Sequence, residues 1–273
     1  MILLLVAGCS DDVEPPSESR ATSPATDEGT DFDGLVKVDD GRSLYLHCTG
    51  EGSPTLVLEG GDEDTSDSYG FAEDALSGVT RTCVYDRANL GQSDPDPRRR
   101  GLDELVDDLT QVLEYGEVPG PYVLVGTSGG GYITAGFAYE NPEQVVGMVF
   151  VEVPAPFRNP PAEIVEITRW NSEVNIESRD YLQVEKDAWA ARTEIGGIPV
   201  TVISNEYSPN EIAAAAFPSE ARGMRVNVQD QSGWLVLSPR AEQVVVHTGH
   251  AVEEADPQLV IDAILAVVRE ARA

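Results

Sequence analysis

The chain has 273 residues, enough for one large α/β domain with its own core and too few for two such domains. Its 48 Asp and Glu residues exceed its 18 Lys and Arg residues, and the resulting formal charge of −30 excludes nucleic acid as a partner and disfavours anionic membrane surfaces and acidic substrates. Three scattered histidines and the absence of a phosphate-binding glycine loop give no spacing for a metal or a cofactor, so we expect neither.

The chain opens with an apolar segment that is too short to cross a bilayer as a helix. It leads into Val6-Ala7-Gly8-Cys9, which is similar to a bacterial lipobox. Residues 1–9 would then be the remnant of a signal, with Cys9 lipidated and the protein exported and anchored at the cell-surface membrane. The alternative interpretation is a leftover hydrophobic N terminus without this function.

Residues 10–33 have the composition of a disordered tether. They include eight acidic residues, one arginine and three prolines, and they cannot bury enough apolar surface to offset the entropy lost on ordering. Repulsion between like charges would extend such a segment. We therefore expect an acidic tether between the anchor and a folded domain at residues 34–273.

The first half of that domain shows the hydrophobic patterns of four strands and one helix. Asp-Gly at positions 40–41 favours a tight hairpin turn, and the apolar residues of the helix recur at helical spacing. The predicted elements are a hairpin of strands at 35–38 and 44–48, strands at 55–58 and 79–85, and a helix at 102–115.

A serine then lies in a glycine-rich turn between a strand and a helix. The apolar strand 122–125 ends in Gly126-Thr127-Ser128-Gly129-Gly130, and an amphipathic helix follows at 131–139. This is the G-x-S-x-G spacing of a nucleophile elbow, in which small neighbours tolerate a strained backbone that exposes the hydroxyl. The alternative is a flexible turn with an incidental serine.

The remaining elements continue the alternation of strands and helices. They are strands at 145–151, 199–203 and 243–246, a helix at about 219–237, and a last helix opened by Asp256-Pro257. Residues 154–197 lack this rhythm and form an insertion. The pattern predicts an α/β fold with a mostly parallel eight-stranded sheet between helices, and a small lid formed by the insertion over the carboxyl ends of the strands.

Motifs after successive strands place the chain near a known family. They are Leu58-Glu59-Gly60-Gly61, Tyr85-Asp86-Arg87 with Gly91-Gln92-Ser93-Asp94, the serine turn, and Gly249-His250 followed by Asp256-Pro257. In this order the chain resembles the α/β-hydrolase family, and in particular its esterases and lipases, from residue 35 to the C terminus. Thr127 departs from the histidine that often precedes the nucleophile. An aspartate at position 128 would have implied dehalogenase or epoxide-hydrolase chemistry instead.

The resemblance implies a catalytic triad. Ser128 would be the nucleophile, and a histidine must take its proton because a free hydroxyl is a weak nucleophile. We expect His250, in the loop after the last strand, to be this base. His47, in an early strand, and His247, at the end of the last strand, are interpreted as structural.

The acid of the triad has two candidates. Glu152 directly follows strand 145–151, a location that some members of the family use. Glu206 lies near the commoner location, after strand 199–203. We favour Glu152 as the acid, with Glu206 as the alternative. The interpretation without a catalytic role is a carboxylate that is solvated or bound to the lid.

The resemblance also implies an oxyanion hole formed by the backbone N–H groups of Gly61 and Gly129. The acidic run Asp62-Glu63-Asp64 beside Gly61 is either a solvated loop or a feature that repels anionic substrates or recruits cations. Glu59 and Arg87 end adjacent strands, and we expect them to pair beneath the site, because a buried charge without a partner is costly.

Two cysteines remain in the domain if Cys9 is lipidated. Cys48 and Cys83 lie on strands that are neighbours in the expected fold, and an exported protein meets oxidising surroundings. We expect a disulfide between them, with two buried free thiols as the alternative.

The predicted function is a serine hydrolase that cleaves carboxylic esters of small molecules through an acyl-enzyme. Acyl transfer to another acceptor, or cleavage of small amides or peptides, would use the same residues. A surface binding module without catalysis is the third possibility, and the presence of both Ser128 and His250 weakens it.

Overall fold

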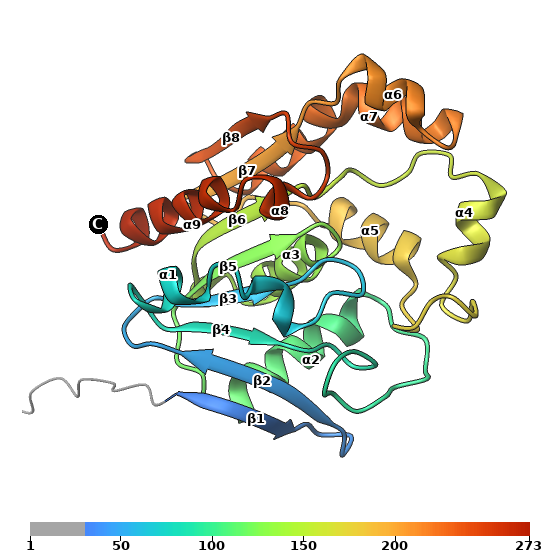
Figure 1. Ribbon diagram of the computed structural model, residues 1–273. Helices are drawn as coiled ribbons and strands as arrows, with labels where there is room; N and C mark the ends of the chain where they lie inside the picture. Colours follow the sequence, from blue (N-terminus) through green and yellow to red (C-terminus); the bar gives the residue numbers. More distant parts are fainter. Residues whose placement is uncertain (1–30) are drawn as a thin grey trace, which may run out of the picture.

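Eight strands form one sheet in the computed structural model, which describes residues 31–273 (Figure 1). The strands are β1 Phe32–Lys37, β2 Ser43–Thr49, β3 Thr55–Glu59, β4 Thr82–Tyr85, β5 Tyr122–Thr127, β6 Val145–Val151, β7 Val200–Asn205 and β8 Ala241–Val246. Their order is β1-β2-β4-β3-β5-β6-β7-β8. Only the pairs β1–β2 and β2–β4 are antiparallel, so the predicted mostly parallel sheet is confirmed.

Helices cover both faces of this sheet. In the described part of the chain they are α1 Glu73–Ser77, α2 Leu102–Tyr115, α3 Gly130–Glu140, α4 Ala162–Ile167, α5 Tyr181–Ala190, α6 Pro209–Ala214, α7 Pro218–Gln231, α8 Val252–Ala255 and α9 Pro257–Ala271, with 3₁₀ helices η1 Ser66–Tyr69, η2 Pro142–Gln144 and η3 Ser232–Leu237. Apolar residues of α2, α3, α5 and η3 fill one core, and those of η1, α1, α8 and α9 fill the other.

The central strands β3 and β5 are buried along their whole length. Successive side chains of a strand point to opposite faces, so Val57 and Leu124 enter one core while Leu58 and Val125 enter the other. This double burial explains why these strands appear in the sequence as short, continuous apolar runs.

The strand β5 and the helix α3 approach each other closely around the serine turn. A Cβ atom on Gly126 would lie 2.5 Å from the Cα of Gly131, which no real side chain tolerates. Glycine is therefore required at this contact, in agreement with the role expected of the small residues around Ser128.

Several predicted boundaries differ from the structure. The expected helix at 219–237 consists of α7 followed by η3, and β4 begins at Thr82 rather than at residue 79. The strand β1 begins at Phe32, so the last two residues assigned to the tether 10–33 belong to the sheet. Phe32 packs against the core and Asp33 accepts a hydrogen bond from the hydroxyl of Tyr45, contacts that sequence composition does not reveal.

Cys48 and Cys83 are paired residues of the antiparallel strands β2 and β4, and they form a disulfide. The predicted lipidation site, Cys9, and residues 10–30 of the predicted tether lie outside the described residues. Within residues 31–273, no helix combines the length and the apolar character needed to cross a membrane.

The insertion, residues 154–197, contains α4 and α5 and lies at the edge of the sheet toward which the parallel strands point (Figure 1). Most of α4 is exposed. Glu177 and Arg179 are different, because each is only 1% exposed. This part of the insertion is an integral part of the folded domain.

Candidate active site

Ser128 follows β5 directly and has a left-handed backbone, with φ of 45°. Its N–H donates to the carbonyl of Val151 at the end of the neighbouring strand β6 (2.9 Å), which fixes the turn against the sheet. A non-glycine residue with positive φ is uncommon and is held only where the surroundings determine it. Ser128 is half-buried and lies at the carboxyl end of β5.

His250 lies in the loop between β8 and α8. Its Nε2 atom is 3.0 Å from the Oγ atom of Ser128, although the two residues are 122 positions apart in sequence. The preceding Gly249 has φ of 89°, and the side-chain oxygen of Asn205 accepts hydrogen bonds from the N–H groups of Thr248 (2.9 Å) and Gly249 (3.0 Å). The end of β7 therefore holds the loop that presents the imidazole.

Glu152 follows β6, and its Oε2 atom is 3.2 Å from Nδ1 of His250. The carboxylate is 1% exposed and also has left-handed φ, at 49°. Four further donors surround it. Oε1 accepts from the Asn205 N–H (2.5 Å), Asn227 Nδ2 (2.9 Å) and Gln231 Nε2 (2.9 Å), and Oε2 accepts from the Tyr207 hydroxyl (3.2 Å).

These contacts define the protonation of the imidazole. A carboxylate can only accept hydrogen bonds, so Nδ1 of His250 carries the proton that faces Glu152 and Nε2 is left to accept one from Ser128. The hydrogen bond with Glu152 raises the pKa of His250 above its ordinary value, although burial acts in the opposite direction. The site thus favours uptake of a proton by His250.

The alternative acid and the other histidines lie elsewhere. The carboxylate of Glu206 is 3.8 Å from Nδ1 of His247, and both side chains are mostly exposed. His47 pairs with Glu73 at 2.9 Å on the far strand β2. The structure therefore places Glu152, and not Glu206, beside His250.

Gly61 and Gly129 both lie beside the serine. Gly129 follows Ser128 at the start of α3, and a Cβ atom on Gly61 would be 3.4 Å from the Cβ of Ser128. The N–H of Gly61 donates to Oδ2 of Asp64 at 2.8 Å. An oxyanion that used the Gly61 N–H would have to replace this carboxylate oxygen, a competitor that the sequence did not reveal.

The expected pairing of Glu59 with Arg87 is confirmed, at 2.8 Å between Oε1 and Nη1, and both residues are buried. Arg87 has a second carboxylate partner that was not predicted, Glu177 of the insertion, at 2.9 Å. Asp62, from the acidic run, pairs with Arg179 of the insertion at 2.9 Å. Part of the acidic run is thus neutralised by the protein itself.

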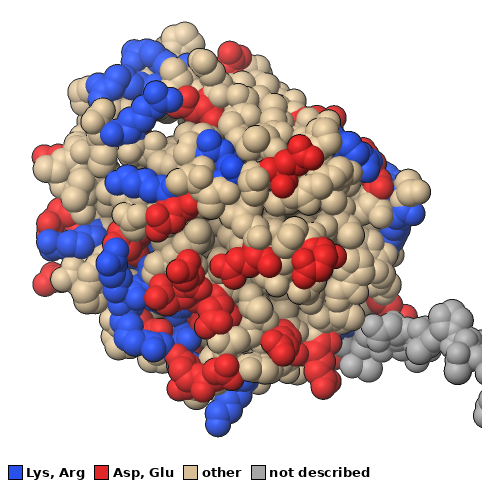
Figure 2. Space-filling model, turned by 180° about the vertical axis from the view of Figure 1, so that it is seen from behind, with Lys and Arg blue, Asp and Glu red and all other residues tan. Residues whose placement is uncertain are grey.

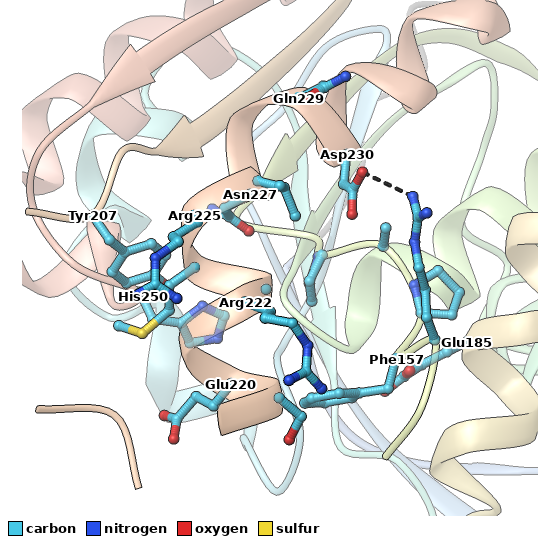
Figure 3. Close-up of a pocket in the computed structure, with 18 of the residues that line it drawn as sticks. Phe157, Glu185, Tyr207, Glu220, Arg222, Arg225, Asn227, Gln229, Asp230 and His250 are labelled. Carbon is cyan, nitrogen blue, oxygen red and sulfur yellow. Dashed lines mark hydrogen bonds and ion pairs between the residues drawn. The ribbon is translucent and has the colours of Figure 1, made fainter. Parts of the chain in front are cut away.

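A pocket of about 960 Å³ adjoins Glu152 and His250 (Figure 3). In this view His250, Tyr207 and Arg225 lie on one side, and Phe157 and Glu185 lie on the other. Its apolar lining comes from the start of the insertion and from α7, namely Pro154, Ala155, Pro156, Phe157, Met224 and Val226. Burial and the charge of Asp62 raise the pKa of Glu185 to about 7, so this carboxyl is partly protonated near neutral pH.

The distribution of charge around this pocket differs from that of the whole chain. Seen from behind, acidic side chains are spread over the surface, whereas most basic ones gather toward the edge that carries the insertion (Figure 2). Arg158, Arg222 and Arg225 line the pocket, together with Glu152, Glu185, Glu220 and Asp230. Positive and negative side chains are therefore mixed around the pocket, although the whole chain has a formal charge of −30.

Sequence reasoning missed the residues that surround the carboxylate of Glu152. Asn205 ends a strand on the ligand-binding side of the sheet, and this position could have identified it. Asn227 and Gln231 are four residues apart on one face of α7, but nothing in a polar helix indicates which carboxylate it will meet. Across residues 31–273, the acidic, histidine and cysteine side chains form no group of three or more that could hold a metal ion.

Comparison with known proteins places these features in a family. The profile of the alpha/beta hydrolase family matches residues 44–266. The uncharacterized protein YqjL of Bacillus subtilis is 23% identical over 226 residues, which cover 81% of this chain and 86% of that protein.

Solved structures of low sequence identity share the fold. A thermophilic esterase from Thermogutta terrifontis has a TM-score of 0.64 with 18% identity, covering 90% of this chain and all of that one. The carboxylesterase CesB (YbfK) from Bacillus subtilis has a TM-score of 0.61 with 15% identity, covering 87% and 91% of the two chains. At such identities the likeness concerns architecture, and the chemistry must be argued from the site.

Proposed function

This chain belongs to the alpha/beta hydrolase family, and we propose that it is a serine hydrolase that cleaves carboxylic esters through an acyl-enzyme intermediate. One observation carries the proposal. Ser128, His250 and Glu152 form a continuous chain of contacts, with 3.0 Å from Oγ to Nε2 and 3.2 Å from Nδ1 to Oε2. This is the order of nucleophile, base and orienting acid that acyl transfer needs.

The first half of the reaction forms the acyl-enzyme. Nε2 of His250 takes the proton of Ser128 while Oγ attacks the ester carbonyl carbon, and the carbonyl oxygen becomes an oxyanion. The Gly129 N–H, together with the Gly61 N–H once it leaves Asp64, stabilises this oxyanion. His250 then gives its proton to the departing alcohol. Glu152 keeps its hydrogen bond with Nδ1 and stabilises the charged imidazole.

The second half releases the acid. A water molecule gives its proton to Nε2 of His250 and attacks the acyl carbon, and collapse of the second tetrahedral intermediate returns the proton to Ser128. The pocket beside His250 would hold the apolar part of the ester, since its lining includes Phe157 and Met224. Esterases among the proteins of the same fold support a small ester as substrate.

A fluorophosphonate probe and a series of p-nitrophenyl esters of graded chain length test the proposal. We expect the wild-type protein to be labelled and to release p-nitrophenol, and Ser128→Ala to do neither while its melting temperature stays nearly unchanged. Product analysis with water and an added alcohol separates hydrolysis from acyl transfer, and small amides test the alternative substrate class. Full turnover by Ser128→Ala would remove the proposal.

We also propose that the protein is exported and anchored through a lipid on Cys9. The lipobox-like residues 6–9 and a disulfide in the folded domain support this location. Metabolic labelling with palmitate tests it. Label should be incorporated into the wild-type protein and be absent from Cys9→Ala, and equal labelling of the two would contradict the proposal.

A further inference from the structure

Two buried arginines hold the backbone on both sides of Ser128. Arg87 donates from Nη1 to the carbonyl of Gly60 (2.8 Å) and from Nη2 to the carbonyl of Gly61 (2.6 Å). Arg179, from the insertion, donates from Nη2 to the carbonyl of Gly129 (2.8 Å). The Gly60 carbonyl belongs to the same planar peptide group as the Gly61 N–H, so Arg87 fixes the direction of that donor. The Gly129 carbonyl belongs to the peptide group that follows the Gly129 N–H, so Arg179 restrains the backbone directly after the second donor.

Glu177, also from the insertion, fixes Arg87 in place. Its carboxylate accepts two hydrogen bonds from Arg87, at 2.9 Å from Nε and 3.0 Å from Nη2, and a third from the N–H of Glu63 (2.6 Å). Burial opposes ionisation, but the charge and hydrogen bonds of Arg87 prevail and lower the pKa of Glu177 to about 2. The carboxylate is therefore ionised at every pH used in an assay.

The turn that carries these two side chains is itself rigidly held. The N–H of Arg100 donates to the carbonyl of Ser178, and Nδ2 of Asn175 donates to the carbonyl of Arg179. Ser178 has left-handed φ, at 53°, which a non-glycine residue keeps only where its surroundings determine it. Because the turn is held in this way, Glu177 and Arg179 can restrain the backbone around Gly61 and Gly129.

We propose that Glu177 and Arg179 are positioning residues for the oxyanion hole. Glu177 acts through Arg87 on the Gly60–Gly61 backbone, and Arg179 acts directly on the backbone after Ser128. The insertion would then help to orient the oxyanion donors, a role separate from the predicted lid. The inference rests on the proposed function, because an oxyanion hole serves a purpose only if Ser128 forms a tetrahedral intermediate.

The kinetic signature follows from the timing of oxyanion formation. The donors contact the oxyanion in the transition state and only weakly contact the ground-state carbonyl, so their misalignment lowers kcat more than it changes KM. Loss of one well-aimed donor typically costs about 10²- to 10³-fold in kcat. We expect Arg179→Ala and the isosteric Glu177→Gln to lower kcat by about 10- to 1,000-fold, with KM within about threefold of the wild-type value.

Arg169→Ala is the matched control. Arg169 is an arginine of the same insertion, its side chain is half-exposed, and it pairs with Glu166 on the surface. Its replacement should change neither kcat nor KM. Amide hydrogen exchange gives a second readout, since exchange in peptides covering residues 60–64 and 128–131 should accelerate in the Glu177 and Arg179 variants and not in the control.

The two readouts separate this inference from the proposed function. If the wild-type protein neither turns over esters nor reacts with the probe, the proposed function fails and the oxyanion-hole role fails with it, whereas accelerated exchange still shows that Glu177 and Arg179 restrain the backbone beside Ser128. Unchanged exchange in folded variants overturns the positioning role, as does a kcat near the wild-type value or a rise confined to KM. If Arg179→Ala does not fold, Arg179→Lys is measured by the same criteria. Lysine keeps the charge but has one nitrogen in place of the two guanidinium nitrogens that contact Asp62 and the Gly129 carbonyl.

Discussion

Replacement of Glu152 by glutamine tests the chemistry of the site most directly, because the structure dictates how the new amide must point. Oε1 of Glu152 accepts from three donors, the Asn205 N–H, Asn227 Nδ2 and Gln231 Nε2. An amide nitrogen cannot face three donors, so the glutamine oxygen has to keep this place. Its NH₂ group is then turned toward Nδ1 of His250.

That orientation selects the wrong tautomer of His250. An amide N–H facing Nδ1 makes this nitrogen an acceptor, so the imidazole proton moves to Nε2 and the nitrogen facing Ser128 can no longer accept a proton. A comparable change in a serine protease lowers kcat about 10⁴-fold. We expect a similar loss in Glu152→Gln, which corresponds to about 5 kcal/mol of transition-state stabilisation.

The stability of the same variant should change far less. Glutamine has nearly the same volume as glutamate, and the three donors to the side-chain oxygen keep their acceptor. What is lost is the extra strength of hydrogen bonds to a charged group, so we expect the free energy of unfolding to fall by about 1 to 3 kcal/mol. A stable but inactive protein is the expected result.

The assay is hydrolysis of a p-nitrophenyl ester, with the melting temperature followed by circular dichroism. Glu206→Gln is the control, since its carboxylate lies beside the exposed His247 and should be dispensable. The reasoning is refuted if Glu152→Gln keeps activity within about tenfold of the wild type, or if Glu206→Gln is the inactive variant. In the second case the acid would act from the end of β7.

Three further predictions use other parts of the molecule. Because Glu152 raises the pKa of His250, kcat/KM should fall as the pH drops through a midpoint above about 6.5. Any residual activity of Glu152→Gln should have a lower midpoint, and identical midpoints in the two proteins would contradict the coupling between Glu152 and His250. The disulfide between β2 and β4 joins residues 35 positions apart, so a reductant should lower the free energy of unfolding by about 3 to 4 kcal/mol, and two free thiols in the unfolded, unreduced protein would rule it out. Asp64→Ala should raise kcat severalfold by freeing the Gly61 N–H, and a fall in kcat would mean that this carboxylate instead shapes the turn.

Much of the fold was predictable because local patterns determine it. The helix α2 and the strand β6 have the residues that their hydrophobic spacing predicts, Leu102–Tyr115 and Val145–Val151. The short helices α1, α6 and α8 were not predicted, since four to six residues span hardly more than one turn and give no periodic signal. The break between α7 and η3 was missed for a related reason, because both segments are helical and only the hydrogen-bond pattern changes.

The residues of the candidate site also differ in whether a local sequence signal marks them. Ser128 and His250 were predictable because each has a turn motif beside it in sequence. Glu177 and Arg179 were not, since Glu177 meets Arg87 across 90 positions and Arg179 meets Gly129 across 50. Charged residues in an irregular segment are ordinarily solvated, and nothing local distinguishes these two from their exposed neighbours.

The end of β7 explains how an acid at the end of β6 could serve the proposed triad. In the commoner arrangement a residue after β7 supplies the carboxylate, whereas here β7 ends at Asn205 and the next residue, Glu206, lies beside His247. Its N–H donates to Glu152, and its side-chain oxygen accepts from Thr248 and Gly249. A single residue therefore orients the carboxylate and holds the loop of His250. Orienting the imidazole and anchoring its loop are separate tasks, so the acid can move to the neighbouring strand as long as β7 keeps the second task.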